Sequence, residues 1–475
     1  MDEWSGRRVV ILGAARQGTA LARYLARRGA QVTVNDRRSA EELREARQAL
    51  SDLDDQLAPP IQWVTGGHPL EILEGADLIC ISGGIPLNLP VLVEAHRRGI
   101  PFSNDSQIFL EAAPCKVIGI TGSAGKTTTT TLVGRMAQAA VEMGFERSGI
   151  GKVWVGGNIG TPLISSLDEM QTEDLAVVEL SSFQLEIMTV SPQVSALLNI
   201  SPNHLDRHGT MEAYTAAKAR ILDYQTTDDI AVLGRDDPGV WGLEGRVKGH
   251  LVSFGAHPSR GSAWPGTYVQ GDEVYFEDEQ RRLRLVHRKD ILLRGEHNLQ
   301  NVLAACATSL AAGLPAEAVE AGVQGFTGVP HRLQFIRNWG GADWYNDSIA
   351  TAPERTIAAI RSFDEPLVLL VGGRDKDLPW DEFARLARQR IDHLVVFGEA
   401  AGKIIQALET SGESLGDTGH PTIVRCKGLR QAVEETSRIV RPGDVVLLSP
   451  GGTSFDEFSD FEERGICFTR LVMQL

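Results

Sequence analysis

A glycine-rich segment near residue 120 carries residues suited to binding a nucleoside triphosphate. The apolar run Val117–Ile120 predicts a buried strand, and residues 121–128 continue it as Thr-Gly-Ser-Ala-Gly-Lys-Thr-Thr before a helical pattern begins. The backbone N–H groups of such a loop, with the start of the following helix, attract phosphate. We expect Lys126 to contact the outer phosphates and the Thr127 hydroxyl to bind Mg²⁺. An ordinary glycine-rich turn is the alternative, because Ile120 replaces the first glycine of the common motif.

Three further polar residues stand where they could serve the same site. Glu179 ends a strand-like apolar run, where P-loop enzymes place a Mg²⁺ partner, although a helix cap is the simpler interpretation. His204 follows the predicted strand Val194–Ile200 and could meet a metal ion or a γ-phosphate, whereas an isolated histidine is more often structural. Lys218 lies on a predicted helix over residues 211–224, where a lysine usually faces solvent.

The first 40 residues have the pattern of a nucleotide-binding βαβ unit. Arg8–Leu12 and Gln31–Asp36 predict strands, and the segment Gly13–Gly18 opens the helix between them. Ala15 replaces the middle glycine of the dinucleotide fingerprint, so a nicotinamide cofactor is disfavoured and another nucleotide-linked ligand is favoured. The carboxylate that ends the second strand could contact a ribose or cap a helix.

Alternating strands and helices along the rest of the chain must position these loops. A strand over residues 76–82 leads into a second glycine loop, a β-rich stretch begins near residue 231, and residues 326–332 indicate a linker. Further buried strands are predicted at 366–373 and 445–448. The sequence therefore predicts an α/β fold of three domains: a Rossmann-like domain over 1–112, a central P-loop ATPase-like mononucleotide-binding domain over 113–328, and a Rossmann-like domain over 329–475.

Composition restricts the kinds of partner and environment. The 475 residues carry a net charge of −15, which disfavours a protein that wraps nucleic acid or lies on an anionic membrane. Five scattered cysteines without a C-x-x-C pair disfavour a zinc site and a disulfide framework. Without a membrane-length apolar run or a secretory signal pattern, we expect a cytoplasmic protein.

The order of motifs along the chain resembles the Mur ligases, in particular their glutamate-adding branch. The matching motifs, in chain order, are Thr-Gly-Ser-Ala-Gly-Lys-Thr-Thr, Gly-Asn-Ile-Gly, Glu-Leu-Ser-Ser-Phe-Gln-Leu-Glu, Asn-His-Leu-Asp-Arg-His, His-Asn-x-x-Asn, Pro-His-Arg, Asn-Asp-Ser and Ser-Phe-Asp-x-Phe-x-x-Phe-Glu-x-Arg-Gly. The resemblance implies an ATP-dependent ligase of peptidoglycan precursor synthesis. Such an enzyme joins glutamate to UDP-N-acetylmuramoyl-L-alanine through an acyl phosphate, with D-glutamate the expected acceptor, and we expect a monomer.

The resemblance also implies roles for residues at matching positions. The ATP phosphates would bind Gly122, Ser123, Ala124, Gly125, Lys126, Thr127 and Thr128, with Asn298 at the adenine and Arg332 and Asp347 at the γ-phosphate and ribose. Two Mg²⁺ ions would be held by Thr127, Glu179, His204 and Lys218. Lys218 would be carbamylated, because a carbamate presents two oxygens to a cation and an ammonium presents none. The catalytic set would be Lys126, Glu179, His204, Lys218 and Arg332.

Substrate positions carry over from the resemblance in the same way. The UDP moiety would meet Arg16, Gln17, Asp36, Arg37, Ser82 and Gly84, and the muramoyl-peptide end would meet Asn158. Glutamate would meet Thr351, Lys376, Ser454 and Phe461.

Two departures from the family pattern leave the acceptor open. Ile349 stands where the family usually has a lysine, and Gly451-Gly452 replaces Ala-Cys or Ala-Ala in the loop expected to hold the glutamate side chain. An L-glutamate-adding relative is therefore one alternative. A folylpolyglutamate synthase-like ligase is another, although those proteins usually begin near their P-loop. From a different class, a nicotinamide-binding oxidoreductase or sensor would explain Gly13–Asp36 but would give Lys126 and Glu179 no role.

Overall fold

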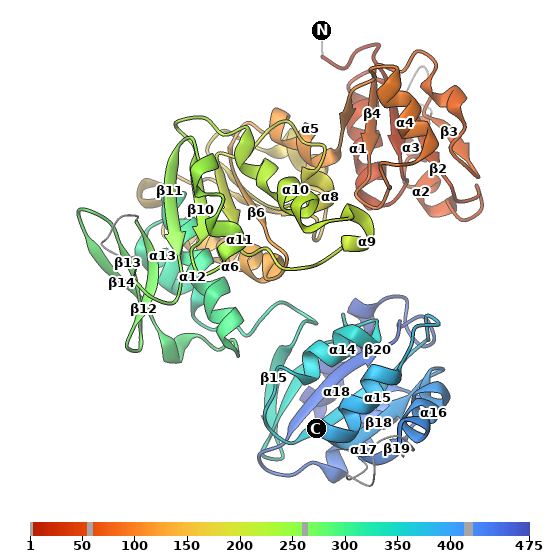
Figure 1. Cartoon of the computed structure of the whole chain (residues 1–475), viewed down its shortest axis with the longest axis vertical. Coiled ribbons are helices and arrows are strands. Elements are labelled where there is room, and N and C mark those ends of the chain that lie inside the picture. Colours follow the sequence, from red (N-terminus) through yellow and green to blue (C-terminus); the bar gives the residue numbers. More distant parts are fainter. Residues whose placement is uncertain (1–2, 55–59, 259–264, 413–420) are drawn as a thin grey trace. The chain divides into compact units, whose positions relative to one another are not determined.

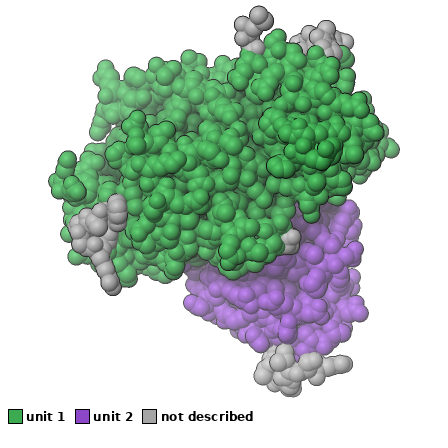
Figure 2. Space-filling view, turned by 45° about the horizontal axis from the view of Figure 1, so that its top comes forward, with its two compact units in different colours: residues 1–291, 296–325 green, residues 292–295, 326–475 purple. Residues whose placement is uncertain are grey.

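The strands of this computed structural model form three sheets over the described residues, which are 3–54, 60–258, 265–412 and 421–475 (Figure 1). Residues 1–291 and 296–325 belong to one compact unit, and residues 292–295 and 326–475 belong to a second unit (Figure 2). The first unit contains two of the sheets and the second contains the third. The predicted α/β class is confirmed.

The first sheet is entirely parallel, with the strand order β3-β2-β1-β4-β5. Its strands are β1 (Arg8–Leu12), β2 (Gln31–Asp36), β3 (Gln62–Thr65), β4 (Leu78–Ile81) and β5 (Phe102–Ser103). Its helices are α1 (Arg16–Arg27), α2 (Arg44–Gln48), α3 (Ser51–Asp54), α4 (Pro90–Arg97), α5 (Asp105–Ala112) and the 3₁₀ helix η1 (Leu70–Leu73). The strand order reverses between β1 and β4, and ligands of such sheets bind at the carboxyl ends of the strands that flank this point.

The central sheet has the strand order β14-β13-β12-β11-β10-β9-β6-β8-β7. Its strands are β6 (Lys116–Thr121), β7 (Val153–Gly157), β8 (Leu175–Glu179), β9 (Val194–Leu197), β10 (Ile230–Gly234), β11 (His250–Phe254), β12 (Gly266–Gln270), β13 (Glu273–Glu277) and β14 (Arg282–His287). In this order, all neighbouring strands from β12 to β7 are parallel, whereas β13 pairs antiparallel with both β12 and β14. Because β6 lies between β8 and β9, the loops after these three strands emerge beside one another.

Helices cover this sheet, and α6 (Lys126–Glu142) follows the glycine-rich loop directly. As the helical spacing predicts, α6 buries Leu132, Val133 and Met136 completely. The other helices are α7 (Phe145–Ser148), α8 (Ser182–Leu185), α9 (Leu205–His208), α10 (Met211–Asp223), α11 (Pro238–Trp241), α12 (Glu296–Ala311), α13 (Ala316–Val323), η2 (Leu163–Glu169), η3 (Glu244–Arg246) and η5 (Arg288–Asp290).

The third sheet has the order β15-β16-β20-β17-β18-β19 and is parallel except for its edge strand β15. Its strands are β15 (Gln334–Trp339), β16 (Ala342–Asn346), β17 (Leu367–Gly372), β18 (Ile391–Phe397), β19 (Thr422–Arg425) and β20 (Val445–Gly451). Its helices are α14 (Pro353–Ile360), α15 (Asp381–Arg390), α16 (Ala401–Gly412), α17 (Leu429–Ile439) and α18 (Phe461–Gln474). Among the described residues, no helix is both long and apolar enough to cross a membrane.

A short segment of the chain, Leu292–Gly295, leaves the first unit and belongs to the second. Its Arg294 guanidinium forms an ion pair with Asp343 at 3.0 Å and a second with Glu365, and it lies 5.3 Å from the ring of Tyr345. The chain therefore passes between the units before residue 292, after residue 295 and after residue 325.

The contact between α6 and α13 depends on a glycine. A Cβ atom at Gly322 would lie 2.7 Å from the Met136 backbone, so we expect Gly322→Ala to destabilise the chain by about 1–3 kcal/mol through overpacking. Gly245→Ala is the matched control, because a Cβ at Gly245 meets nothing within 4 Å. Thermal unfolding monitored by tryptophan fluorescence measures both variants, and equal melting shifts would contradict the packing argument.

Candidate active site

The glycine-rich loop after β6 is bound by the side chain of Asn199 and packs closely against Asn301. Gly125 precedes α6 with φ +80°, and a Cβ there would lie 2.0 Å from the Oδ1 atom of Asn301, so this position requires glycine. The side chain of Asn199 accepts a hydrogen bond from Ala124 N at 2.8 Å and donates to Ala124 O at 3.1 Å. Lys126 begins α6, and its Nζ atom donates to Gly122 O at 2.9 Å.

The buried carboxylate of Glu179 accepts hydrogen bonds from two other predicted site residues. Strand pairing places Glu179 opposite Ile120, next to the start of the glycine-rich loop. The Thr127 hydroxyl donates to Oε2 of Glu179 at 2.9 Å, and the Asn158 amide donates to Oε1 at 2.9 Å. Glu179 is 2% exposed. A carboxylate and a hydroxyl in contact form an oxygen donor set of the kind that Mg²⁺ prefers, so Thr127 and Glu179 fit that cation.

Lys218 is buried against the same loop, contrary to the usual behaviour of a lysine on a helix. It is 1% exposed on α10, and its Nζ atom donates to Gly122 O at 2.8 Å. Burial and, to a smaller extent, the charge of Lys126 lower the pKa of Lys218 to about 6, although the Glu179 carboxylate opposes the shift. The amine is therefore mostly neutral near pH 7, which is the nucleophilic form.

His204 lies at the start of α9 in the left-handed conformation, with φ 53°. Its ring centroid is 5.0 Å from that of Phe183, while the neighbouring His208 ring stacks on Phe183 at 5.2 Å. Among the described residues there is no group of three or more His, Cys, Asp or Glu side chains placed to hold a metal ion. The metal-binding role of His204 stays a prediction.

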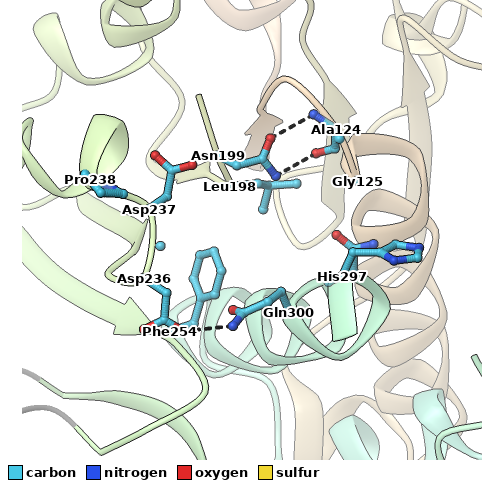
Figure 3. A pocket seen from close by; sticks show the side chains of 12 residues that line it. Ala124, Gly125, Leu198, Asn199, Asp236, Asp237, Pro238, Phe254, His297 and Gln300 are labelled. Atoms are coloured by element: carbon cyan, nitrogen blue, oxygen red, sulfur yellow. Dashed lines mark hydrogen bonds between the residues drawn. The ribbon is translucent and has the colours of Figure 1, made fainter. Parts of the chain in front are cut away.

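A cavity of about 290 Å³ opens beside the glycine-rich loop (Figure 3). Its wall is formed by Ala124, Gly125, Leu198, Asn199, Gly234, Asp236, Asp237, Pro238, Phe254, His297, Gln300 and Asn301. Asn298, predicted at the adenine, accepts a hydrogen bond from Asn301 at 3.0 Å, and its helix neighbours line the wall. Partial burial of the imidazole lowers the pKa of His297, which favours its neutral form.

The sequence analysis missed the acidic and aromatic side of this cavity. Asp236 and Asp237 follow β10, which pairs with β9, and Phe254 ends β11. These residues could have been predicted, because Asp236 and Asp237 follow a parallel strand two places from the P-loop strand, and ligands bind at the carboxyl ends of such strands. The sequence analysis described this region only as β-rich and did not assign the strand to the same sheet.

The predicted UDP-binding residues lie at the carboxyl ends of β1, β2 and β4. Asp36 is buried, and its carboxylate accepts hydrogen bonds from Ala14 N at 2.8 Å and from Arg38 N, Nε and Nη2 at 2.8–3.0 Å. Burial opposes ionisation, but the hydrogen bonds from Arg38 and Ala14 outweigh it and hold the pKa of Asp36 well below its usual range. Asp36 therefore fastens the loop after β1 to the loop after β2.

The other predicted residues of this region surround those loops. Arg16 and Gln17 begin α1, Arg37 and Gly84 are exposed, and the Ser82 hydroxyl donates to Gly13 O at 3.3 Å.

The predicted γ-phosphate, ribose and glutamate residues lie in the second unit, around the end of β16. Asp347 is 5% exposed; the Ser449 hydroxyl donates to its Oδ2 at 2.9 Å and Leu333 N donates to its Oδ1 at 3.2 Å. Arg332 lies between two residues with positive φ, His331 at 63° and Leu333 at 42°.

The residues predicted to bind the substrate glutamate lie in the loops after neighbouring strands and at the start of α18. The Lys376 Nζ atom is 3.4 Å from the Thr351 hydroxyl, Ser454 is buried, and Phe461 is the first residue of α18. The fully buried guanidinium of Arg464 donates to Ser348 O at 2.9 Å, Ser348 Oγ at 3.0 Å and Gly452 O at 3.1 Å.

The glycine pair that departs from the family pattern is required by its surroundings. Gly451 has φ +68°, and a Cβ there would lie 2.7 Å from the indole ring of Trp380. A Cβ at Gly452 would lie 2.6 Å from Gly372 O. Both glycines are therefore needed in this loop as it is built.

Three family models match successive parts of the chain. Residues 7–103 match the MurD-like N-terminal domain of Mur ligases, residues 120–309 match the Mur ligase middle domain, and residues 331–452 match the glutamate ligase domain of Mur ligases. The chain belongs to the Mur ligase family.

Full-length relatives make the comparison more specific. A UDP-N-acetylmuramoylalanine–D-glutamate ligase of Symbiobacterium thermophilum is 39% identical over 468 residues, covering 98% of each chain. The enzyme of the same name from Koribacter versatilis is 38% identical, covering 99% of this chain and 98% of the relative.

Solved structures of more distant members share the fold. UDP-N-acetylmuramate-alanine ligase MurC from Thermotoga maritima aligns with a TM-score of 0.53 at 18% identity, covering 98% of this chain and 99% of that chain. MurF from Acinetobacter baumannii aligns with a TM-score of 0.54 at 19% identity, covering 98% and 91%.

The buried Asp347 carboxyl gives a test based on pH. Burial raises its pKa to about 7, while hydrogen bonds from Ser449 and Leu333 oppose the shift. Its proton is bound more tightly in the folded chain, so the resulting stabilisation is complete below about pH 4 and is lost as pH rises through about 7. Asp347→Asn removes this titration. The free energy of unfolding of the variant, relative to that of the parent, should therefore increase as the pH is raised from about 4 to about 7.

Thermal unfolding across this pH range measures the effect. Asp364→Asn, an exposed aspartate of the same unit, is the control. A pH profile that is identical for the parent and Asp347→Asn would contradict a carboxyl that titrates in the folded chain.

Proposed function

We propose that this chain is an ATP-dependent acid–amino-acid ligase that adds D-glutamate to UDP-N-acetylmuramoyl-L-alanine in peptidoglycan precursor synthesis. The observation that carries the proposal is full-length identity of 39% to a ligase of that name, together with the Thr127–Glu179 pair at the end of the glycine-rich loop. The match of residues 7–103 to a MurD-like domain disfavours a folylpolyglutamate synthase-like ligase, and family membership disfavours an oxidoreductase.

The chemistry explains why the site combines cations with a phosphate loop. The alanyl carboxylate attacks the γ-phosphorus of ATP, ADP leaves, and an acyl phosphate forms. The amine of glutamate then attacks the acyl carbon, a tetrahedral intermediate collapses, inorganic phosphate leaves, and the amine loses a proton. The first step brings two anions together, so positive charge beside the γ-phosphate lowers its barrier.

Residues of the first unit have distinct roles in this proposal. The Gly122–Gly125 backbone holds the phosphates, Thr128 extends this cradle at the start of α6, and Lys126 exchanges its carbonyl partner for a phosphate oxygen. Mg²⁺, when bound, neutralises phosphate charge, with Thr127 and Glu179 as its oxygen ligands. A second Mg²⁺ site would use His204 and a carbamylated Lys218. The buried, mostly neutral amine of Lys218 supports carbamylation, because that form reacts with carbon dioxide.

The remaining assignments concern the ends of the substrates. Arg16, Gln17, Asp36, Arg37, Ser82 and Gly84 would hold the UDP moiety, with Asp36 acting through the loops that it fastens. Asn158 would meet the muramoyl-peptide end, and Asn298 the adenine. Arg332 and Asp347 would meet the γ-phosphate and ribose. Thr351, Lys376, Ser454 and Phe461 would meet glutamate. We also propose domains at 1–112, 113–328 and 329–475, a monomer, and a cytoplasmic location.

One observation favours a second candidate, a ligase that adds L-glutamate. Ile349 stands where the family usually has a lysine, so a cation is missing near the proposed acceptor site, although Lys376, Ser454 and Phe461 supply the expected anchors.

Product formation with each glutamate enantiomer tests the proposal and its alternative. We expect ADP release and an amide product that require both UDP-N-acetylmuramoyl-L-alanine and D-glutamate. Lys126→Ala should reduce the rate on the order of 10²-fold or more, because a phosphate-neutralising charge is lost in a buried site. Turnover of L-glutamate alone would establish the alternative, and no amide product with either enantiomer would overturn the ligase assignment.

The carbamate assignment has its own test. We expect Lys218→Ala to be nearly inactive and to recover part of its activity when small carboxylates are added, because these restore the oxygens. Intact-protein mass spectrometry under native conditions should show a carbon dioxide adduct that Lys218→Arg lacks. A fully active alanine variant would rule this role out.

A further inference from the structure

The side-chain amide of Gln300 is held in one orientation at the wall of the cavity beside the phosphate loop. Its Nε2 atom donates to Oδ2 of Asp236 at 2.8 Å, and the same oxygen accepts from Ala256 N at 2.6 Å. An ionised carboxylate only accepts hydrogen bonds, so the nitrogen of the Gln300 amide, and not its oxygen, must face Asp236. In Figure 3 the amide oxygen of Gln300 lies on the cavity side.

Two other polar side chains of the wall, those of Asp237 and Asn199, are bound to the backbone of the protein. The Asp237 carboxylate accepts from Val240 N at 2.9 Å and from Ile200 N at 3.1 Å. The Asn199 amide is bound through both its polar atoms to Ala124. The Phe254 ring supplies an apolar surface in this wall. The Gln300 oxygen is thus an acceptor whose direction is fixed before a ligand enters.

We propose that Gln300 selects a 6-aminopurine over a 6-oxopurine in the bound nucleoside triphosphate. An exocyclic amino group donates a hydrogen bond to the Gln300 oxygen, whereas a 6-oxo group presents a second acceptor to it. Rotation of the amide to accommodate the oxo group would turn its oxygen toward the Asp236 carboxylate. Two acceptors would then face each other, so this orientation is disfavoured. Asp236 is a positioning residue in this arrangement. The inference rests on the proposed use of a nucleoside triphosphate.

The test compares ATP with inosine triphosphate, which differs at position 6 and lacks the additional 2-amino group of guanosine triphosphate. For Gln300→Ala we expect the ratio of kcat/KM for the two nucleotides to fall about fivefold to tenfold, the effect of one neutral hydrogen bond. The change should be in KM rather than kcat, because the base is remote from the reacting phosphate. Gln324→Ala is the matched control, an exposed glutamine of the same unit outside the cavity.

Two variants of Asp236 test the positioning role. Asp236→Asn retains an oxygen that can accept from both Gln300 and Ala256, so it should preserve the nucleotide preference. Asp236→Ala releases the amide and should reduce the preference toward the value of Gln300→Ala. Equal preference in the parent and Asp236→Ala would overturn the positioning role.

Calorimetric binding of the two nucleotides to the full chain, without UDP-sugar or glutamate, provides a readout independent of turnover. A weaker preference for ATP in Gln300→Ala than in the parent supports the inference. An unchanged preference overturns it, even where the ligase activity is intact. Absence of amide product in the parent overturns the proposed ligase instead, so the two failures are distinguishable.

Discussion

The pairing of β6 with β8 is the constraint on which the phosphate loop depends. This register puts Glu179 opposite Ile120, one residue before the loop begins, and makes its side chain available to Thr127 and Asn158. A carboxylate buried to this extent is costly unless donors surround it. Three segments that are distant in the chain therefore meet at one charge, and a shift of either strand by one residue would turn Glu179 to the other face of the sheet.

Arg464 and Lys218 are both buried basic side chains, but they differ in the number of hydrogen bonds that stabilise their charge. Arg464 is fully buried, yet its guanidinium donates three hydrogen bonds to oxygens of Ser348 and Gly452, and burial lowers its pKa only to about 10. It remains charged and holds two loops together. Lys218 makes one such bond, to Gly122 O, and burial, with a smaller effect of the charge of Lys126, lowers its pKa to about 6. The lysine can give up its proton, and the arginine cannot.

The parts that could be predicted from sequence are those in which neighbours along the chain determine the structure. The run Val117–Ile120, the glycines after it and the spacing of Leu132 and Met136 specify a strand, a loop and a helix without long-range information. The α/β class followed from the same alternation. The positions that the sequence did not reveal depend on distant partners. The orientation of Gln300 depends on Asp236, and Arg294 of the segment Leu292–Gly295 forms ion pairs with Asp343 and Glu365 of the second unit.

Gly451 and Trp380 form a pair in which each residue limits the size of the other. The indole occupies the space that a Cβ at position 451 would need, and the positive φ of Gly451 adds a backbone cost for any larger residue. An alanine at position 451 therefore first requires a smaller residue at position 380. A change as small as the addition of one methyl group at position 451 is thus prevented by a side chain 71 positions away in the sequence.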